Sequence, residues 1–193
     1  MTYKKNPLCP YESGRHRKTC CQKIPRSARL AMRESVEALS KAGKHLEACE
    51  LLEKLVTLSP HNPLIWNDLG IQYEAAGQMD KALDALRRSH QADSTYPPAL
   101  YNLGKFTLDR FIGFHKAGLA TKAEVQEMLI EAINLLNANL DRDPDNADGH
   151  YYLALAYGMK EDERMALAHM TVALRLRQAS DTPLEAVVRS VVR

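Results

Sequence analysis

Apolar residues recur along this chain with helical spacing and a long, regular period. Four alanines lie 34, 50 and 34 residues apart, where 50 is one period plus 16 further residues: Ala48, Ala82, Ala132 and Ala166. Each is followed four positions later by a large apolar residue: Leu52, Leu86, Leu136 and Met170. Residues four apart share one face of a helix. A fixed period of this length predicts stacked helical hairpins.

The second period shows the pattern most completely. Its segment WNDLGIQY places Trp66, Leu69, Gly70 and Tyr73 on a first helix, and Gly77 stands at the turn before a second helix. Two helices approach closely only where one of them lacks a bulky side chain, so Gly70 and the alanine of this period are expected at the contact. The pattern resembles the tetratricopeptide repeat (TPR).

The resemblance to the TPR family covers residues 29–180. It implies an all-α fold, a right-handed superhelix of about four TPR helical hairpins, with units at residues 29–62, 63–96, 97–146 and 147–180. The fourth unit has Glu161 where the turn glycine of the family is expected. A scaffold that displays a binding surface is the leading expectation for such a repeat protein, ahead of an enzyme.

The third unit carries the 16 extra residues. They fall between its two helices, so we expect about two extra turns on each helix and a hairpin that projects beyond its neighbours. Phe106, Phe111 and Phe114 lie on or near this extension. Their rings either bind a partner helix or cover the apolar residues of the returning helix, which are Val125, Leu129 and Ile133.

The last residues, 181–193, have the pattern of one amphipathic helix. Apolar residues fall at i, i+3, i+4, i+7 and i+8: Leu184, Val187, Val188, Val191 and Val192. A helix with one apolar stripe buries that stripe. We expect it to cap the uncovered end of the last repeat, and pairing with another subunit is the alternative.

Charge is distributed unevenly along the chain. Residues 1–33 hold nine Lys or Arg and the single Glu12, whereas the remainder holds 17 basic and 23 acidic residues. A basic head of this kind could attract phosphate or an acidic protein surface, and the alternative is a solvated arm. It has no apolar core typical of a secretory signal, and no run in the chain approaches the roughly 18 apolar residues of a membrane span, so a cytoplasmic protein is expected.

The head, residues 1–28, contains the segment CPYESGRHRKTCC. It resembles the SEC-C motif, a small zinc module with the pattern C-P-C-G-S-G-x-x-Y-x-x-C-C. Cys9, Cys20 and Cys21 stand at the matching offsets, whereas Tyr11 replaces the second cysteine and Glu12 the first glycine.

A structural zinc ion needs four ligands, and nearby positive charge favours the thiolates that bind it. The expected ligands are Cys9, Cys20 and Cys21, with His16, four residues before Cys20, as a tentative fourth. The alternatives are a degenerate module that folds without metal and a redox-active Cys20–Cys21 pair. Cys49 is expected to be a small core residue.

The TPR resemblance also implies a binding groove lined by the first helix of each unit. The positions it carries over are Arg33, Glu37, Asn67, Ile71, Glu74, Tyr101, Lys105, Tyr151, Leu155 and Met159. This mixture suits an extended or helical peptide, and Asn67 could pair with backbone amides. Members of the family that bind a terminal carboxylate use asparagines where this chain has Glu37 and Asp68, so that ligand is disfavoured.

No arrangement typical of catalysis is present. The histidines are scattered, His150 is interpreted as a packing residue, and the acidic run DRDPDN lacks the glutamate of a calcium loop. We therefore expect a non-enzymatic adaptor that binds a peptide or helix of a partner protein. The alternatives are a nucleic-acid- or ribosome-associated factor that uses the basic head and a protein resembling export or secretion chaperones.

Overall fold

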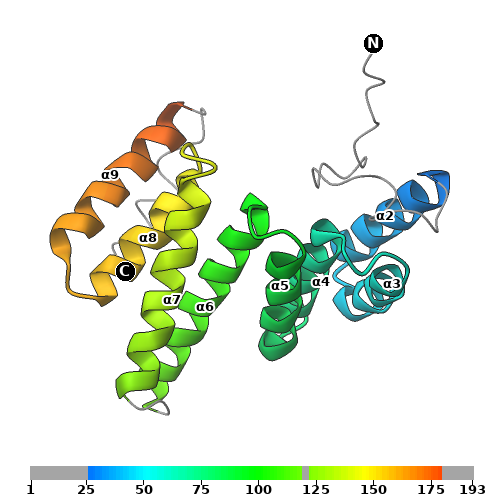
Figure 1. Ribbon diagram of the computed structural model, residues 1–193, viewed down its shortest axis with the longest axis horizontal. Coiled ribbons are helices and arrows are strands. Elements are labelled where there is room, and N and C mark those ends of the chain that lie inside the picture. Colours follow the sequence, from blue (N-terminus) through cyan, green and yellow to red (C-terminus); the bar gives the residue numbers. More distant parts are fainter. Residues whose placement is uncertain (1–25, 119–121, 180–193) are drawn as a thin grey trace, which may run out of the picture. The chain divides into compact units, whose positions relative to one another are not determined.

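The computed structural model describes residues 26–118 and 122–179. The described residues form eight helices and no strand, which confirms the predicted all-α helical-repeat class (Figure 1). In chain order they are α2 (Arg26–Lys41), α3 (His45–Leu58), α4 (Pro63–Ala75), α5 (Met79–Ala92), α6 (Pro97–Ala117), α7 (Lys122–Leu140), α8 (Ala147–Met159) and α9 (Glu163–Ala179). The predicted cysteine module and the predicted C-terminal helix lie outside these residues.

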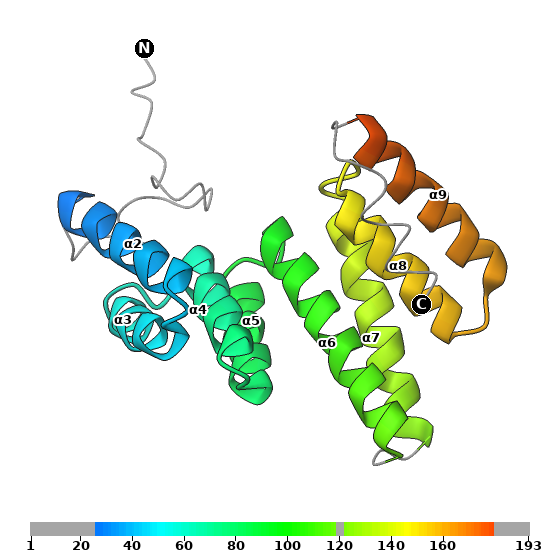
Figure 2. The ribbon, with the colours of Figure 1, turned by 180° about the vertical axis from the view of Figure 1, so that it is seen from behind.

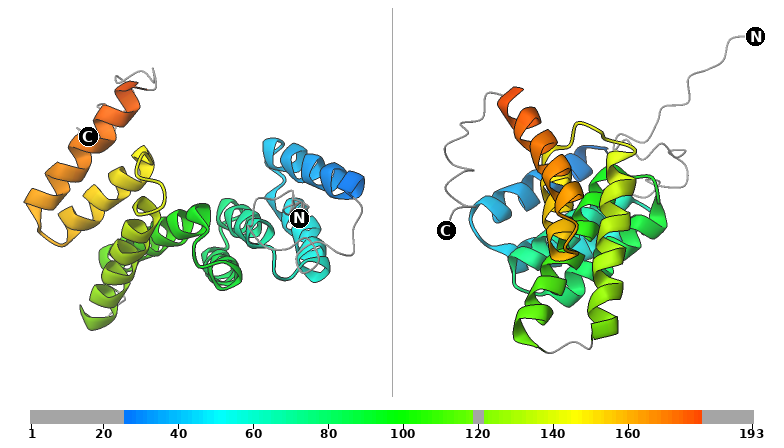
Figure 3. Two further views of the ribbon diagram at one scale, coloured as in Figure 1. Left: turned by 45° about the horizontal axis from the view of Figure 1, so that its top comes forward. Right: turned by 90° about the vertical axis from the view of Figure 1, so that its left-hand side faces the viewer.

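The chain divides into two compact units, Met1–Asn102 and Leu103–Arg193, with the division inside α6. Within the first unit, α2 packs on α3, α3 on α4 and α4 on α5. Within the second, α7 packs on α8 and α8 on α9. The pair α8 and α9 runs side by side in Figures 1 and 2, and the left view of Figure 3 shows the same pair.

Equivalent asparagines begin the first helices of two hairpins. Asn62 precedes α4, and its side-chain oxygen accepts a hydrogen bond from the backbone N–H of Leu64 at 3.1 Å, with Pro63 in the first helical turn. Asn146 precedes α8 and accepts from the backbone N–H of Gly149 at 2.9 Å. Each asparagine satisfies an N–H group that the helix itself cannot pair.

The core forms where the repeated alanines pack against the neighbouring helix. Ala48, Ala82 and Ala132 are 0% exposed, whereas Ala166 is half-buried. Gly70 has the same role on α4, because a Cβ atom built there would lie 2.7 Å from Cγ of Leu86. Ala166 differs because it lies on α9, the last described helix, which no further described helix covers.

The third hairpin is longer than the second, and its two helices share the extra residues unequally. Helix α6 has 21 residues against 13 in α4, and α7 has 19 against 14 in α5. Phe106 and Phe111 are buried at 2% and 3% exposure, whereas Phe114 is half-buried beneath the guanidinium of Arg110. The structure therefore supports the interior packing role for two of the three rings.

Candidate functional site

The predicted groove residues lie on the first helices of the hairpins, and each compact unit holds its own set. The first unit holds Arg33, Glu37, Asn67, Ile71, Glu74 and Tyr101. The second unit holds Lys105, Tyr151, Leu155 and Met159.

Asn67 is committed to contacts inside the protein. It is 4% exposed, and its side-chain oxygen accepts a hydrogen bond from Nδ2 of Asn102 at 2.9 Å. Its amide also hydrogen-bonds the neighbouring Asp68 carboxyl. Asn67 is thus part of a polar link between α4 and α6. Its contacts do not favour the predicted role, in which Asn67 pairs with the backbone of a ligand. Sequence reasoning missed Asn102, although it stands 34 residues after Asp68 in the same repeat position.

Asp68 lies at the edge of a small apolar hollow. The hollow encloses about 20 Å³, and its lining residues are Arg33, Val36, Leu52, Leu55, Leu64, Ile65 and Asp68. Burial raises the pKa of the Asp68 carboxyl to about 6, while the positive charge of Arg33 and the hydrogen bond from Asn67 act in the opposite direction. A volume of this size suits one methyl-sized group or one water molecule.

The remaining predicted residues of the first unit are accessible to different degrees. Arg33 and Glu37 are exposed, whereas Ile71, Glu74 and Tyr101 are half-buried. Glu37 accepts a hydrogen bond from Nζ of Lys41 at 2.6 Å, and this contact holds the pKa of its carboxyl below the usual range. The predicted groove residues of the first unit therefore combine charged and apolar groups on α2, α4 and the start of α6.

In the second unit, cations lie over aromatic rings. Nζ of Lys105 is 5.0 Å from the ring centre of Phe106 and 5.7 Å from that of Tyr152. Tyr151 meets Tyr152 edge to face at 5.5 Å between ring centres. The guanidinium of Arg177 lies 5.4 Å from the ring centre of Tyr151. These contacts order Lys105 and Tyr151 by interactions within the protein.

The other two predicted residues of this unit carry apolar surface. Leu155 is half-buried, and Met159, at the end of α8, is 37% exposed. Met159 lines a second, larger hollow that the periodicity of the sequence did not predict.

His150 and His169 form a packed pair between α8 and α9. Their Nδ1 atoms are 3.0 Å apart, Nε2 of His150 donates to the carbonyl of Pro144 at 3.1 Å, and His169 stacks on Tyr157. Burial first, and the nearby His150 second, lower the pKa of His169. Because Nε2 of His150 donates to that carbonyl, its Nδ1 accepts from Nδ1 of His169, and the contacts are those of a packing role.

The described residues offer little basis for metal binding or for thiol chemistry. No group of three or more His, Cys, Asp or Glu side chains there could hold a metal ion. Cys49 is buried, and burial raises the pKa of its thiol to about 11, so it stays protonated and packs as an apolar group. The predicted zinc ligands Cys9, His16, Cys20 and Cys21 lie outside the described residues. No described helix is both long and apolar enough to cross a membrane.

Comparisons with known proteins agree with this geometry. Residues 39–103 match the family model described as tetratricopeptide repeat. No curated protein matches the sequence significantly. The structure of MamA is 20% identical, with a TM-score of 0.60, over 77% of this chain and 78% of that one.

Two further solved structures share this fold of helical hairpins. TTC0263, a thermophilic TPR protein in Thermus thermophilus, is 17% identical with a TM-score of 0.65, over 77% of this chain and 74% of that one. The first TPR of Spaghetti (RPAP3), bound to the HSP90 peptide SRMEEVD, is 16% identical with a TM-score of 0.58, over 72% of this chain and 98% of that one. The helical hairpins described above therefore have the tetratricopeptide repeat fold, and residues 39–103 match its family model.

Proposed function

We propose that this protein is a non-enzymatic interaction scaffold that binds a segment of a partner protein across α2, α4 and the start of α6. The observation that carries the proposal is the surface beside the Asp68 hollow. There an exposed cation, Arg33, and a partly buried carboxyl, Asp68, flank an apolar floor. The hydrogen bond from Asn102 to Asn67, the neighbour of Asp68 in the sequence, links α4 to α6.

The chemistry of this surface indicates what kind of segment it accepts. The hollow takes the tip of one apolar side chain, and Asp68 accepts a hydrogen bond from a donor on the ligand. The half-buried Ile71 and Tyr101 offer apolar contact to the same segment. Tyrosine supplies a large contact area at a low cost in conformational entropy.

An acidic C-terminal peptide is a poor ligand for this surface. RPAP3 binds the HSP90 peptide SRMEEVD. Here Glu37 and Asp68 would face such a terminal carboxylate, and like charges in partly buried surroundings repel one another. We infer that the ligand is an internal segment or one that carries a donor or a positive charge at this point.

The proposal is tested by affinity capture with single variants of the full chain. Arg33→Glu and Ile71→Ser change the proposed surface, and Arg87→Glu changes an exposed arginine of α5 as a matched control. Proteins captured from lysate of the source cells are quantified by mass spectrometry. We expect a partner that the wild type and Arg87→Glu retain equally, and that the other two variants lose by about tenfold, a difference of about 1.4 kcal/mol. Thermal melts establish that each variant is folded, and equal capture by all four proteins would refute the proposal.

The zinc module is a separate prediction. Metal analysis of the purified full chain is expected to find about one zinc ion per molecule. Replacing Cys20 and Cys21 by serine should remove it, and metal content that is unchanged by these substitutions would contradict the assignment.

A further inference from the structure

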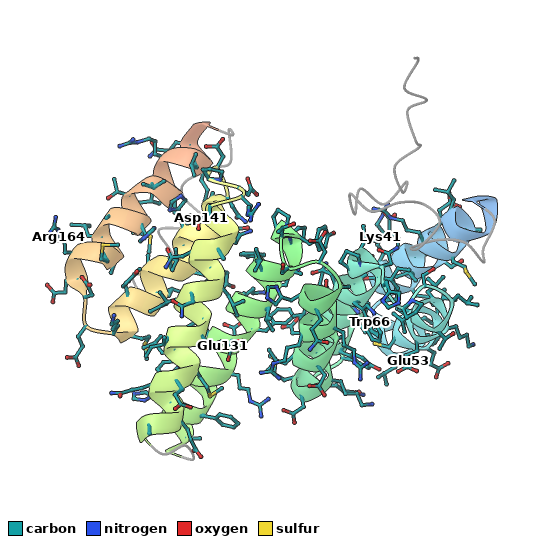
Figure 4. All side chains as sticks on the ribbon, viewed as in Figure 1. Lys41, Glu53, Trp66, Glu131, Asp141 and Arg164 are labelled. Atoms are coloured by element: carbon teal, nitrogen blue, oxygen red, sulfur yellow. The ribbon has the colours of Figure 1, made fainter. Side chains whose placement is uncertain are left out.

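The Asp68 hollow combines an apolar lining with one charged residue of each sign. Its apolar lining residues come from three helices that pack in succession: Val36 from α2, Leu52 and Leu55 from α3, and Leu64 and Ile65 from α4. The charged lining residues are Arg33 on α2 and Asp68 on α4. Figure 4 labels Lys41 at the end of α2 and Trp66 on α4, which locate these two helices among the side chains. The hollow lies wholly within the first compact unit.

The volume of the hollow limits what can enter it. About 20 Å³ is enough for one methyl-sized group. A water molecule of similar size needs at least two hydrogen-bond partners, and the side chains of five of the seven lining residues offer none. The side chain of alanine, or one branch of valine, therefore suits this space, whereas the longer side chain of leucine does not.

Arg33 and Asp68 carry opposite charges beside this hollow without forming an ion pair. Within the described ranges, neither side chain has an ion-pair partner at an N···O distance of 4.0 Å or less. Burial raises the pKa of the Asp68 carboxyl to about 6, although the charge of Arg33 acts in the opposite direction. A partly buried carboxyl with few donors is costly, so a ligand N–H that donates to Asp68 would reduce that cost.

An extended peptide backbone complements this pair of charges. Each residue of a peptide offers one N–H donor and one C=O acceptor. The ionised carboxyl of Asp68 only accepts hydrogen bonds, and the guanidinium of Arg33 only donates them. A helical segment has its N–H and C=O groups paired within itself, so a segment that bonds both residues must be extended. A lysine side chain of the ligand would satisfy Asp68, but Arg33 would repel it.

We propose that the Asp68 hollow is the specificity subsite of the binding surface, and that it accepts an extended segment whose anchor residue is alanine or valine. The anchor side chain fills the hollow, the anchor N–H donates to Asp68, and a neighbouring carbonyl accepts from Arg33. This inference rests on the proposed function. It adds that the bound segment is extended rather than helical and that its anchor side chain is small.

The first test selects peptides from a phage-displayed library of random heptapeptides on the immobilised full chain. One position of the enriched peptides should favour alanine and valine over leucine and phenylalanine by about tenfold, a preference of about 1.4 kcal/mol. Leu64→Ala shortens a half-buried lining side chain, so it should enlarge the hollow and move the preference to leucine or methionine. Leu51→Ala is the matched control, because Leu51 is a half-buried leucine of α3 that does not line the hollow.

The second test measures the hydrogen bond to Asp68. The most enriched peptide is synthesised with and without a methyl group on the anchor nitrogen, and binding is measured by fluorescence anisotropy. The methyl group removes the N–H donor, so it should weaken binding to the wild type by about tenfold. It should weaken binding to Asp68→Ala by less than about twofold, because that variant has no carboxyl to accept the bond. Thermal melts establish that each variant is folded.

The outcomes separate this inference from the proposed function. Enriched peptides with apolar residues at helical spacing, or without a small anchor, would overturn the inference alone if Arg33→Glu and Ile71→Ser still abolish their binding. An equal change of preference with Leu64→Ala and Leu51→Ala would also overturn it, as would an equal effect of the methyl group on the wild type and Asp68→Ala. A library that yields no enriched peptide, or peptides whose binding survives Arg33→Glu and Ile71→Ser, would refute the proposed function together with the inference.

Discussion

Single residues in the turns between helices adopt a left-handed backbone conformation that few residue types tolerate. Gly43 and Gly77 have φ values of 71° and 74°, and Glu161 occupies the equivalent turn between α8 and α9 with a φ of 62°. The sequence already showed that the glycine is missing from this turn. The structure adds that the turn keeps its left-handed conformation, so the glutamate bears the steric cost that glycine avoids.

Glu161→Gly should therefore stabilise the protein. We expect the free energy of unfolding to rise by about 1 kcal/mol, because the relief of strain exceeds the greater flexibility of glycine in the unfolded chain. Urea denaturation followed by circular dichroism measures the change.

Glu163→Gly is the matched control, since Glu163 is an exposed residue in the first turn of α9. Glycine costs up to about 1 kcal/mol in a helix and also removes an acidic side chain from the N-terminal turn, so this variant should be less stable than the wild type. A loss of stability in both variants would contradict the account of the turn.

The identities of single residues also explain which part of the surface beside the Asp68 hollow could be predicted. The repeat register placed Asn67, Ile71 and Tyr101 on first helices, as the structure does. Register does not report the distance between side chains in different repeats. The hydrogen bond from Asn102 to Asn67 joins residues 35 apart, and nothing in either segment alone predicts it.

Paired helices approach closely at small residues. On α4, a Cβ atom at Gly70 would lie 2.7 Å from Cγ of Leu86 and 3.1 Å from the carbonyl oxygen of Ala82. Both neighbours belong to α5, so a larger residue at position 70 must push the two helices apart or displace a fully buried leucine. The sequence predicted this contact, because Gly70 and Ala82 are small residues of the second period and two helices approach closely only where one lacks a bulky side chain.

Gly70→Ala should lower the free energy of unfolding by about 1 to 3 kcal/mol, the usual cost of overpacking a core. Thermal and urea denaturation of the variant measure the loss.

Gly113→Ala makes the same change at a helical glycine that has no atom within 4 Å of the added Cβ. It should gain up to about 1 kcal/mol from helix propensity alone. Equal effects of the two substitutions would mean that close packing is not what requires glycine at position 70.

Across the whole molecule, acid should affect the two compact units in opposite directions. In the first unit, the pKa of Asp68 is raised to about 6, so its contribution to stability is fully present below the unfolded value of 3.8 and is lost as pH rises through about 6. In the second unit, the pKa of His169 is lowered, so its contribution is present above the unfolded value of 6.5 and is lost as pH falls.

Lowering the pH from about 7 to about 5 should therefore slow amide hydrogen exchange in α4 and speed it in α9. Hydrogen exchange with mass spectrometry measures both helices in one sample, after correction for the intrinsic effect of pH on exchange. Asp68→Asn should remove the change in α4 alone, and His169→Gln the change in α9 alone. A change of the same sign in both helices would contradict the assignment of these two groups.

The sequence by itself determined the all-α helical-repeat fold. A period of 34 residues with small residues at fixed positions can be satisfied only by helices that meet at those positions, and each period carries this information locally. Only the tertiary structure decided which polar groups meet and where a hollow remains. The link between Asn67 and Asn102 depends on the spacing between hairpins, and the hollow that Met159 lines depends on where α8 ends relative to the longer helices beside it. The sequence predicted the longer helices of the third hairpin, but the periodicity of one chain does not encode the distances between elements on which both features depend.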